Sequence, residues 1–345
     1  MKKIKTNSLI ETIKIQMKTN PIFTTGIALL IMIFLQTLAL GFDFPSIGVW
    51  FDSWINNWLN ILRNNASIGI IALGMSFVII SGGIELAVGS TLVAVSAVMM
   101  LVINASPTGL LTAMGIQGIP AFIIGVFVAL LLATFLGSIT GIIITKGKIP
   151  PFIATLGTMQ ILRSVTQHFM QSKSLIVPTG FLKIANFQIG GKYLLPIIYW
   201  IFIAVILAYV SKKTLFGRRV YAIGSNERAA RLSGINVDKV RIGVYALIGL
   251  MVGIASILQV SRIGSMDFAN AGSGFEMDAI AAVIVGGTSM SGGKGSISGT
   301  IIGTLIIAVM NNLLNLLGVP PFLRDAFKGF IVIVAVLVQR KEKNT

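Results

Sequence analysis

The chain has 345 residues, of which 55% are hydrophobic and 11% are charged, and its mean hydropathy is +0.90. A soluble domain carries about 25% charged residues, so this composition indicates a polytopic helical membrane protein rather than a soluble enzyme. The chain has no cysteine and one histidine, His168, which excludes disulfide scaffolds, thiol catalysis and metal sites built from Cys or His clusters.

Residues 1–20 form a basic segment ahead of the first apolar run, as a signal peptide would. The run 21–41 is longer than a signal-peptide core, and Gly41-Phe42-Asp43-Phe44-Pro45 is a poor cleavage site. We therefore expect a cytosolic segment 1–20 followed by a retained first span.

Apolar runs recur along the whole chain. A membrane-spanning helix needs about 20 apolar residues. The clear candidates are 21–41, 65–81, 86–104, 119–145, 193–211, 242–261, 297–318 and 321–338. Two shorter segments, 150–166 and 276–290, are rich in Gly, Pro or Thr and indicate short or broken helices buried among their neighbours. We expect one all-α membrane domain over 21–338 with about ten spans.

The lysines and arginines predict the topology. If the N-terminus is cytosolic and each span crosses once, nineteen of the 27 basic residues lie on the inner side and eight on the outer side. This asymmetry favours a cytosolic N-terminus, a cytosolic tail at 339–345 and an even number of spans. Topology then explains the net charge of +16, and we expect no nucleic-acid partner.

The first polar interruption is Ser81-Gly82-Gly83-Ile84-Glu85-Leu86-Ala87-Val88-Gly89-Ser90, at the inner turn before span 86–104. We interpret Gly82 and Gly83 as a helix junction. Two readings of Glu85 stay open. It is either a solvated acid in a tight turn or part of a junction that flexes along a translocation path.

The segment Lys148–Met159 contains Pro150-Pro151, which favours a helix start. Thr and Gly inside a membrane helix permit close packing or expose backbone to a cavity. Packing is the expected role of Gly157, and Phe152, Thr155 and Thr158 are candidates for lining a translocation path.

The longest polar segment is the loop 212–241. Its basic residues are Lys212, Lys213, Arg218, Arg219, Arg228, Arg231, Lys239 and Arg241. Ser225 or Asn226 is a suitable N-cap, Glu227 and Arg231 match the helix dipole, and Gly234 suits a left-handed stop. The loop therefore predicts one short helix at about 226–233. On the cytosolic side, such a helix is a docking surface for a soluble partner.

The segment Gly272–Gly295 contains the carboxylates Glu276 and Asp278. Residues two apart on a helix face different ways, so a place in the first helical turn is a better reading than acid–base catalysis. Gly286 and Gly287 are candidates for a second helix junction. The glycine run is no phosphate-binding loop, because Lys294 is followed by Gly295.

Asn311, Asn312 and Asn315 lie deep in the span 297–318. Amides in apolar surroundings need hydrogen-bond partners. They either join helices or line a path for a polar solute, and Lys328 admits the same two readings. No catalytic or metal-binding arrangement is visible in the sequence.

Five runs carry a family resemblance. They are SGGIELAVGS (81–90), IPPFIATLGTM (149–159), GRRVYAIGSNERAARLSGINVDKVRI (217–242), GSGFEMDAIAAVIVGGTSMSGGKGSISGTIIG (272–303) and NNLLNLLGV (311–319). In this order and spacing they resemble the permease subunits of bacterial sugar ABC importers, of the ribose, xylose, arabinose and galactoside type, and most closely the ribose permeases. Where that family usually has Asp-Leu-Ser-Val-Gly, this chain has Glu85-Leu86-Ala87-Val88-Gly89, which keeps the acid and loses a hydroxyl.

The resemblance implies a permease fold like that of the vitamin B12 importer, in the bacterial cytoplasmic (inner) membrane. It implies import of a monosaccharide by alternating access, with outer loops near 42–64, 166–192 and 262–276 receiving the sugar. The implied partners are a second permease copy, most simply as a homodimer, membrane lipid, an extracytoplasmic sugar-binding protein and a cytosolic ATPase with two nucleotide-binding halves. ATP and Mg would sit on that ATPase, and this chain would bind no cofactor and catalyse no reaction.

The loop helix matches the family's coupling helix, which sits in a groove of the ATPase. The residues that this match assigns to coupling are Gly224, Ser225, Asn226, Glu227, Arg228, Ala229, Ala230, Arg231, Leu232 and Gly234.

Three other functions are weighed against a sugar permease. A permease of the same family for nucleosides, autoinducer furanosyls or another small solute is not separated from it by sequence. A stand-alone secondary transporter would need charges in mid-span, and these are scarce apart from Lys328 and Glu85. A membrane-embedded enzyme lacks candidate catalytic residues.

Overall fold

The computed structural model describes residues 21–333 apart from residues 108, 172, 174, 321, 322 and 332. Its helices are α2 (Pro21–Leu40), α3 (Ile47–Ile80), α4 (Val88–Ile103), α5 (Leu110–Ala113), α6 (Ile119–Lys146), α7 (Pro151–Met170), α8 (Thr179–Asn186), α9 (Leu195–Lys213), α10 (Leu215–Ser225), α11 (Glu227–Leu232), α12 (Val237–Ile263), α13 (Phe275–Val285) and α14 (Ile297–Leu316). Residues 323–331 are also helical. The expected segments 1–20 and 339–345, and the end of the expected span 321–338, lie outside the described residues.

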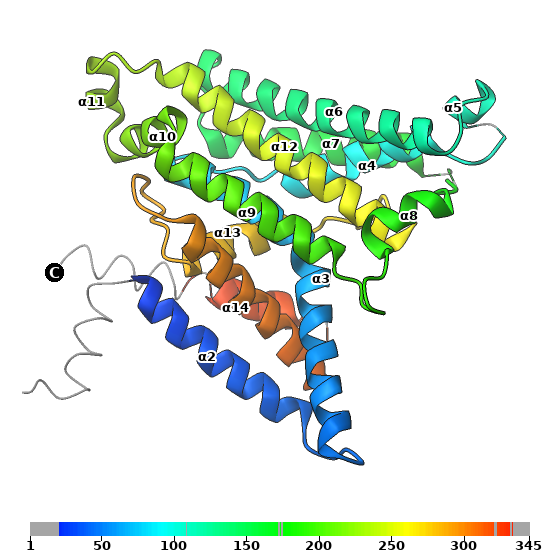
Figure 1. Ribbon diagram of the computed structural model, residues 1–345. Coiled ribbons are helices and arrows are strands. Elements are labelled where there is room, and N and C mark those ends of the chain that lie inside the picture. The colour runs from blue at the N-terminus through cyan, green and yellow to red at the C-terminus, as the bar shows by residue number, and fades with distance from the viewer. Residues whose placement is uncertain are drawn as a thin grey trace, which may run out of the picture.

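The all-α membrane architecture predicted from composition is confirmed. Six helices of the described chain, α2, α3, α6, α9, α12 and α14, are long and apolar enough to cross a membrane. In Figure 1 the small helices α10 and α11 lie at one end of the bundle, and α8 lies at the other. We call these ends the α11 end and the α8 end. Helix α2 begins at the α11 end, and α3 begins at the far end of α2 and runs back. The described chain forms no strand and only an isolated bridge between Ile189 and Lys192.

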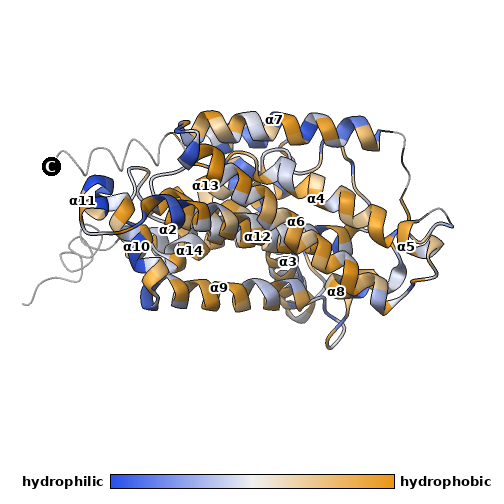
Figure 2. Cartoon of the chain, turned by 90° about the horizontal axis from the view of Figure 1, so that it is seen from above, coloured by the Kyte–Doolittle hydropathy of each residue, from blue (hydrophilic) through white to orange (hydrophobic). Residues whose placement is uncertain are grey.

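Hydropathy varies across the bundle in the way a membrane requires. Figure 2 shows α7 and α9 on opposite flanks, with α9 almost wholly apolar, while hydrophilic residues gather at α10 and α11. Helix α6 has two distinct faces: Phe127, Leu131 and Phe135 are each more than half exposed, as suits contact with lipid.

The other face of α6 packs closely on α12. Small residues follow one another every four positions along α6, at Ala129, Ala133, Gly137 and Gly141, and all are buried. A Cβ added at Gly137 would overlap the carbonyl oxygen of Tyr245, and one at Gly249 of α12 would overlap that of Ala133. Small residues at this spacing let helix backbones approach, which is the main source of helix association in lipid. The α6–α12 pair is therefore closely packed, backbone against backbone, along one face of α6.

Two expected boundaries are wrong. Residues 42–64 were expected as an outer loop ahead of a span at 65–81, but α3 is one helix of 34 residues from Ile47 to Ile80. The side chain of Ser46 caps it by accepting from the backbone N–H of Val49 at 3.3 Å. Polar residues of its first half interrupt the apolar run without interrupting the helix, because helix formation does not require an apolar sequence.

The second correction concerns 150–166, expected to be short and buried. Helix α7 runs for 20 residues from Pro151 to Met170, and Ile161 and Phe169 are about 65% exposed. Its Thr and Gly content lowers the apolar signal of a helix that lies on the flank of the bundle (Figure 2).

We predict that Gly249→Leu destabilises the folded protein. The new side chain must enter the space occupied by the Ala133 carbonyl, and overpacking of this kind costs about 1–3 kcal/mol or more. The melting temperature of the purified protein in detergent measures the effect. Gly157→Leu on α7 is the control, since nothing lies within 4 Å of a Cβ there. Equal melting temperatures for the two variants would contradict the packing described.

Candidate functional site

The polar loop 212–241 folds into two helices rather than the single one expected. Helix α10 is capped by Thr214, whose hydroxyl accepts from the backbone N–H of Gly217 at 3.2 Å. Helix α11 is capped by Asn226, whose side-chain oxygen accepts from Ala229 N–H at 2.9 Å, and Gly234 after it has φ of 81°. Gly224 and Ser225, expected within the coupling helix, therefore end α10. Helix α10 was not predicted from the sequence, because its cap residue Thr214 directly follows the preceding span.

Ion pairs fix α11 to the start of α12. One oxygen of Glu227 accepts from Arg231 at 2.9 Å, and the other accepts from Arg241 at 2.8 Å. Arg231 also donates to Asp238 at 2.9 Å. These donors lower the pKa of the Glu227 carboxyl, the bond from Arg241 contributing most, so the carboxylate stays charged at neutral pH. Arg231, assigned to docking by sequence, is thus engaged within the loop.

The remaining face of α11 points outward. Leu232 is 83% exposed, an unusual position for a large apolar side chain, and Arg228 and Ala229 are exposed beside it. Ala230 is buried on the opposite face, against the bundle. We call Arg228, Ala229 and Leu232 the α11 face. It combines one positive charge with an apolar contact area, as a docking surface for a soluble protein does.

Behind α11, the backbone of α10 meets the end of α3. The carbonyl oxygen of Ile80, at the last residue of α3, accepts from Gly293 N–H at 2.9 Å. A Cβ added at Gly224 would overlap that same carbonyl oxygen. Gly293 has φ of 72° and packs on Ser225. We call the contact of Ile80, Gly224 and Gly293 the glycine junction. Three segments that are distant in sequence meet there, and no side chain separates their backbones.

The candidate junction glycines belong to the segments on either side of this contact in sequence. Gly82 and Gly83 follow the end of α3, and Gly82 has φ of 82°. Gly286 caps the end of α13 and Gly287 follows with φ of 86°. The loop after them is held by Tyr221, whose hydroxyl donates to the carbonyl of Gly295 at 2.9 Å.

Glu85 is not solvated. Its side chain is 4% exposed, and one carboxylate oxygen accepts from Ala87 N–H at 2.6 Å. The neighbouring carbonyl of Ile84 accepts from the hydroxyl of Tyr245 at 3.0 Å. The solvated-acid reading is therefore wrong. Glu85 braces the extended connection between α3 and α4.

The α7 candidates for a translocation path do not share a site with the asparagines. Phe152 is 54% exposed, Thr155 is fully buried, and the Thr158 hydroxyl donates to the carbonyl of Ala154 at 3.0 Å. Helix α7 packs on α4 and α6, whereas α14 packs on α2, α3 and α13. The structure thus divides the predicted path residues between different helix groups.

The carboxylates of α13 lie in its first turn, as expected. Glu276 accepts from Gly274 N–H at 3.3 Å. Asp278 is buried and pairs with Lys328 of the last helix at 3.0 Å. This pair explains the charge within the last span as a link between helices.

The asparagines of α14 gather with partners on α3. Asn312 and Asn57 exchange two amide hydrogen bonds of 3.1 and 3.2 Å, which joins the helices. Asn315 accepts from Arg324 at 2.9 Å. Asn311, Asn312 and Asn315 line a hollow together with Asn60 and Asn64 of α3. Sequence reasoning missed Asn60 and Asn64. The signal was present, because 57, 60 and 64 fall on one helical face.

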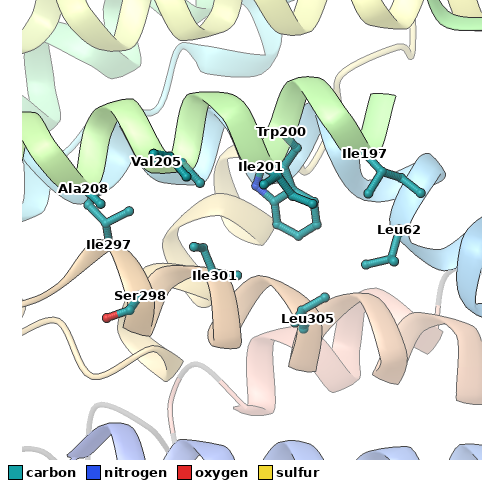
Figure 3. A pocket seen from close by; sticks show the side chains of 11 residues that line it. Leu62, Ile197, Trp200, Ile201, Val205, Ala208, Ile297, Ser298, Ile301 and Leu305 are labelled. Atoms are coloured by element: carbon teal, nitrogen blue, oxygen red, sulfur yellow. The ribbon is translucent and has the colours of Figure 1, made fainter. Parts of the chain in front are cut away.

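A second hollow, of about 350 Å³, lies between α9 and α14 (Figure 3). Trp200 and Ile201 of α9 face Ile301 and Leu305 of α14, and Ser298 supplies a hydroxyl at its border. With so few hydrogen-bonding groups, this surface suits acyl chains rather than a polar solute. Among the described residues, no group of three or more His, Asp or Glu side chains is placed to hold a metal ion.

Known proteins resemble this chain over most of its length. Residues 57–336 match the family described as branched-chain amino acid transport system / permease component. The ribose import permease protein RbsC of Escherichia coli (strain K12) is 42% identical over 295 residues, which cover 84% of this chain and 87% of the relative. RbsC of Bacillus subtilis (strain 168) is 44% identical over 83% of this chain and 85% of the relative.

The galactose/methyl galactoside import permease protein MglC of Haemophilus influenzae is 34% identical, over 82% of this chain and 85% of the relative. No solved structure matches the chain. The family profile and relatives of this identity cover well over two thirds of the chain, so the chain belongs to the branched-chain amino acid transport system / permease component family.

Proposed function

We propose that this chain is the membrane permease subunit of an ABC importer that carries ribose or a similar monosaccharide into the bacterial cytoplasm. The observation that carries the proposal is the identity of 41–44% to ribose import permeases of three species, each over more than four fifths of both chains. The relatives that import galactosides are less similar, at 34%.

The proposed orientation has the α11 end in the cytosol and about ten membrane crossings, in a fold like that of the vitamin B12 importer. The basic loop 212–241 lies at this end, where the positive-inside rule would put it. The other expected crossings would be α4, α7, α13 and the last helix, which is described over 323–331.

The proposed mechanism begins with a cytosolic ATPase that docks on the α11 face and holds the ATP and Mg. Closure of its two halves would move α11 and α10. Because Gly224 lies directly on the carbonyl of Ile80, that movement would reach α3 without an intervening flexible side chain. A homodimer of permeases would then open alternately outward and inward, and an extracytoplasmic binding protein would deliver the sugar.

Reconstitution tests this proposal. The chain is placed in proteoliposomes with the ATPase and binding protein from the same organism, and uptake of radiolabelled ribose is followed with and without ATP. ATP-dependent uptake supports the proposal. Uptake by the chain alone would instead establish a secondary transporter, and uptake of nucleosides but not ribose would establish the alternative permease.

We predict that Leu232→Glu weakens ATPase docking. Charging an exposed apolar side chain at the centre of an interface costs about 2 kcal/mol, so affinity falls roughly tenfold or more. Co-purification of the ATPase with the permease measures it. Leu215→Glu on α10, 62% exposed outside the α11 face, is the matched control. Undiminished co-purification with Leu232→Glu would rule out this docking surface.

Gly224→Ala is predicted to uncouple transport from ATP hydrolysis. The methyl group must displace α10 from the Ile80 carbonyl while leaving the α11 face intact. We expect normal co-purification of the ATPase, with sugar taken up per ATP hydrolysed reduced roughly fivefold or more. Gly157→Ala, where a methyl group has open space, controls for the substitution itself. Wild-type coupling in Gly224→Ala would show that the glycine junction transmits nothing.

A further inference from the structure

A hollow of about 210 Å³ lies between α3, α14 and the last helix. Its lining is dominated by amides. They are Asn60, Asn64 and Asn65 of α3 and Asn311, Asn312 and Asn315 of α14. Asn60, Asn64 and Asn315 are exposed in the single chain, and Asn65, Asn311 and Asn312 are partly exposed. A position facing lipid would be costly for all six, since each amide needs partners that lipid does not offer.

Part of this cluster serves to hold the helices. Asn312 bonds reciprocally with Asn57, and Asn65 donates to the carbonyl of Ile61 at 2.8 Å. These bonds account for the structural reading of the asparagines, as links within and between helices.

The rest of the cluster is left with open hydrogen-bonding capacity. The side-chain oxygen of Asn311 is buried and has no hydrogen-bond partner among the described residues. Asn64 and Asn315 use their oxygens to accept from Arg262 at 2.7 Å and from Arg324 at 2.9 Å. Their amide nitrogens form no hydrogen bond to the described residues. The hollow therefore presents free amide donors, and one acceptor without a partner lies buried in its wall.

This combination fits a neutral polyhydroxylated solute. A hydroxyl group both donates and accepts, so one sugar can accept from the amides of Asn64 and Asn315. It can also donate to the Asn311 oxygen when that side chain turns into the hollow. Arg324 brings the one charge of the lining, and its guanidinium is already held by Asn315 and by the carbonyl of Val319 at 2.8 Å. Neutral amides offer no charge to pair with a charged solute, whereas hydroxyl groups can both donate to them and accept from them.

We propose that this hollow is a binding station for sugar hydroxyls on the translocation path, with Asn311 as its central acceptor. The inference rests on the proposed import of a sugar and adds to it the residues that touch the sugar within the membrane domain.

The test uses the complete importer in proteoliposomes, with radiolabelled ribose at concentrations that saturate the binding protein. Asn311→Leu keeps the side-chain size and removes the acceptor. We expect maximal uptake to fall roughly three- to tenfold, the value of one hydrogen bond. Co-purification of the ATPase should be unchanged, because Asn311 lies on α14, which packs mainly on α2, α3 and α13 rather than on α11. Asn311→Ser, which restores an acceptor, should recover part of the uptake.

Thermal stability separates binding from a purely structural role. Asn311→Leu removes an unpaired buried acceptor, so the melting temperature should stay constant or rise. Asn312→Leu breaks the bond pair with Asn57 and should lower it. Uptake by Asn311→Leu within twofold of wild type would overturn the inference while leaving the proposed function standing. A loss of uptake that is accompanied by a matching fall in melting temperature would also overturn the inference. A wild-type importer that takes up no sugar overturns the proposed function, and this inference with it.

Discussion

The arrangement of the bundle depends on one close contact, where the backbone of α10 lies against the last carbonyl of α3. Carbonyls at a helix end have no partner within the helix, and a membrane domain offers little water to replace one. Ile80 meets this need through Gly293, and Gly224 leaves the space because it has no side chain. The requirement for hydrogen bonding thus brings the basic loop, the end of α3 and the glycine-rich loop after α13 into one unit.

Helix α3 extends from this contact through the bundle. It spans 34 residues without a break, and the residues Asn57, Asn60 and Asn64 lie along it, away from the glycine junction. The same rigid element therefore joins the surface proposed for ATPase docking to the amide-lined hollow proposed for the sugar. In the proposed mechanism, the α6–α12 pair, closely packed through its small residues, would be the stationary part against which α3 moves. Helix α7 would belong to the same stationary part as the α6–α12 pair, since it packs on α4 and α6.

Sequence reasoning succeeded where the signal is local. Apolar runs predicted the long helices, and Asn226 and Gly234 were in place as cap and stop because their backbone preferences need no tertiary partner. It failed where polar residues sit on a continuing helix, as in the first half of α3, and where a cap closely follows a span, as Thr214 does. It had no means of finding that Gly224 meets Ile80 or that Asn312 pairs with Asn57, because the partners are more than 140 residues apart and only folding brings them together.

Spin-label distances measure directly whether α11 and α3 move together. The chain has no native cysteine, so spin labels can be attached at chosen sites without background. Labels at Ser233, Val49 and Gln160 report on the end of α11, the far end of α3 and α7. In the assembled importer we predict that ATP binding leaves the 233–49 distance constant and changes the 49–160 distance. A changed 233–49 distance with a constant 49–160 distance would contradict transmission through the glycine junction.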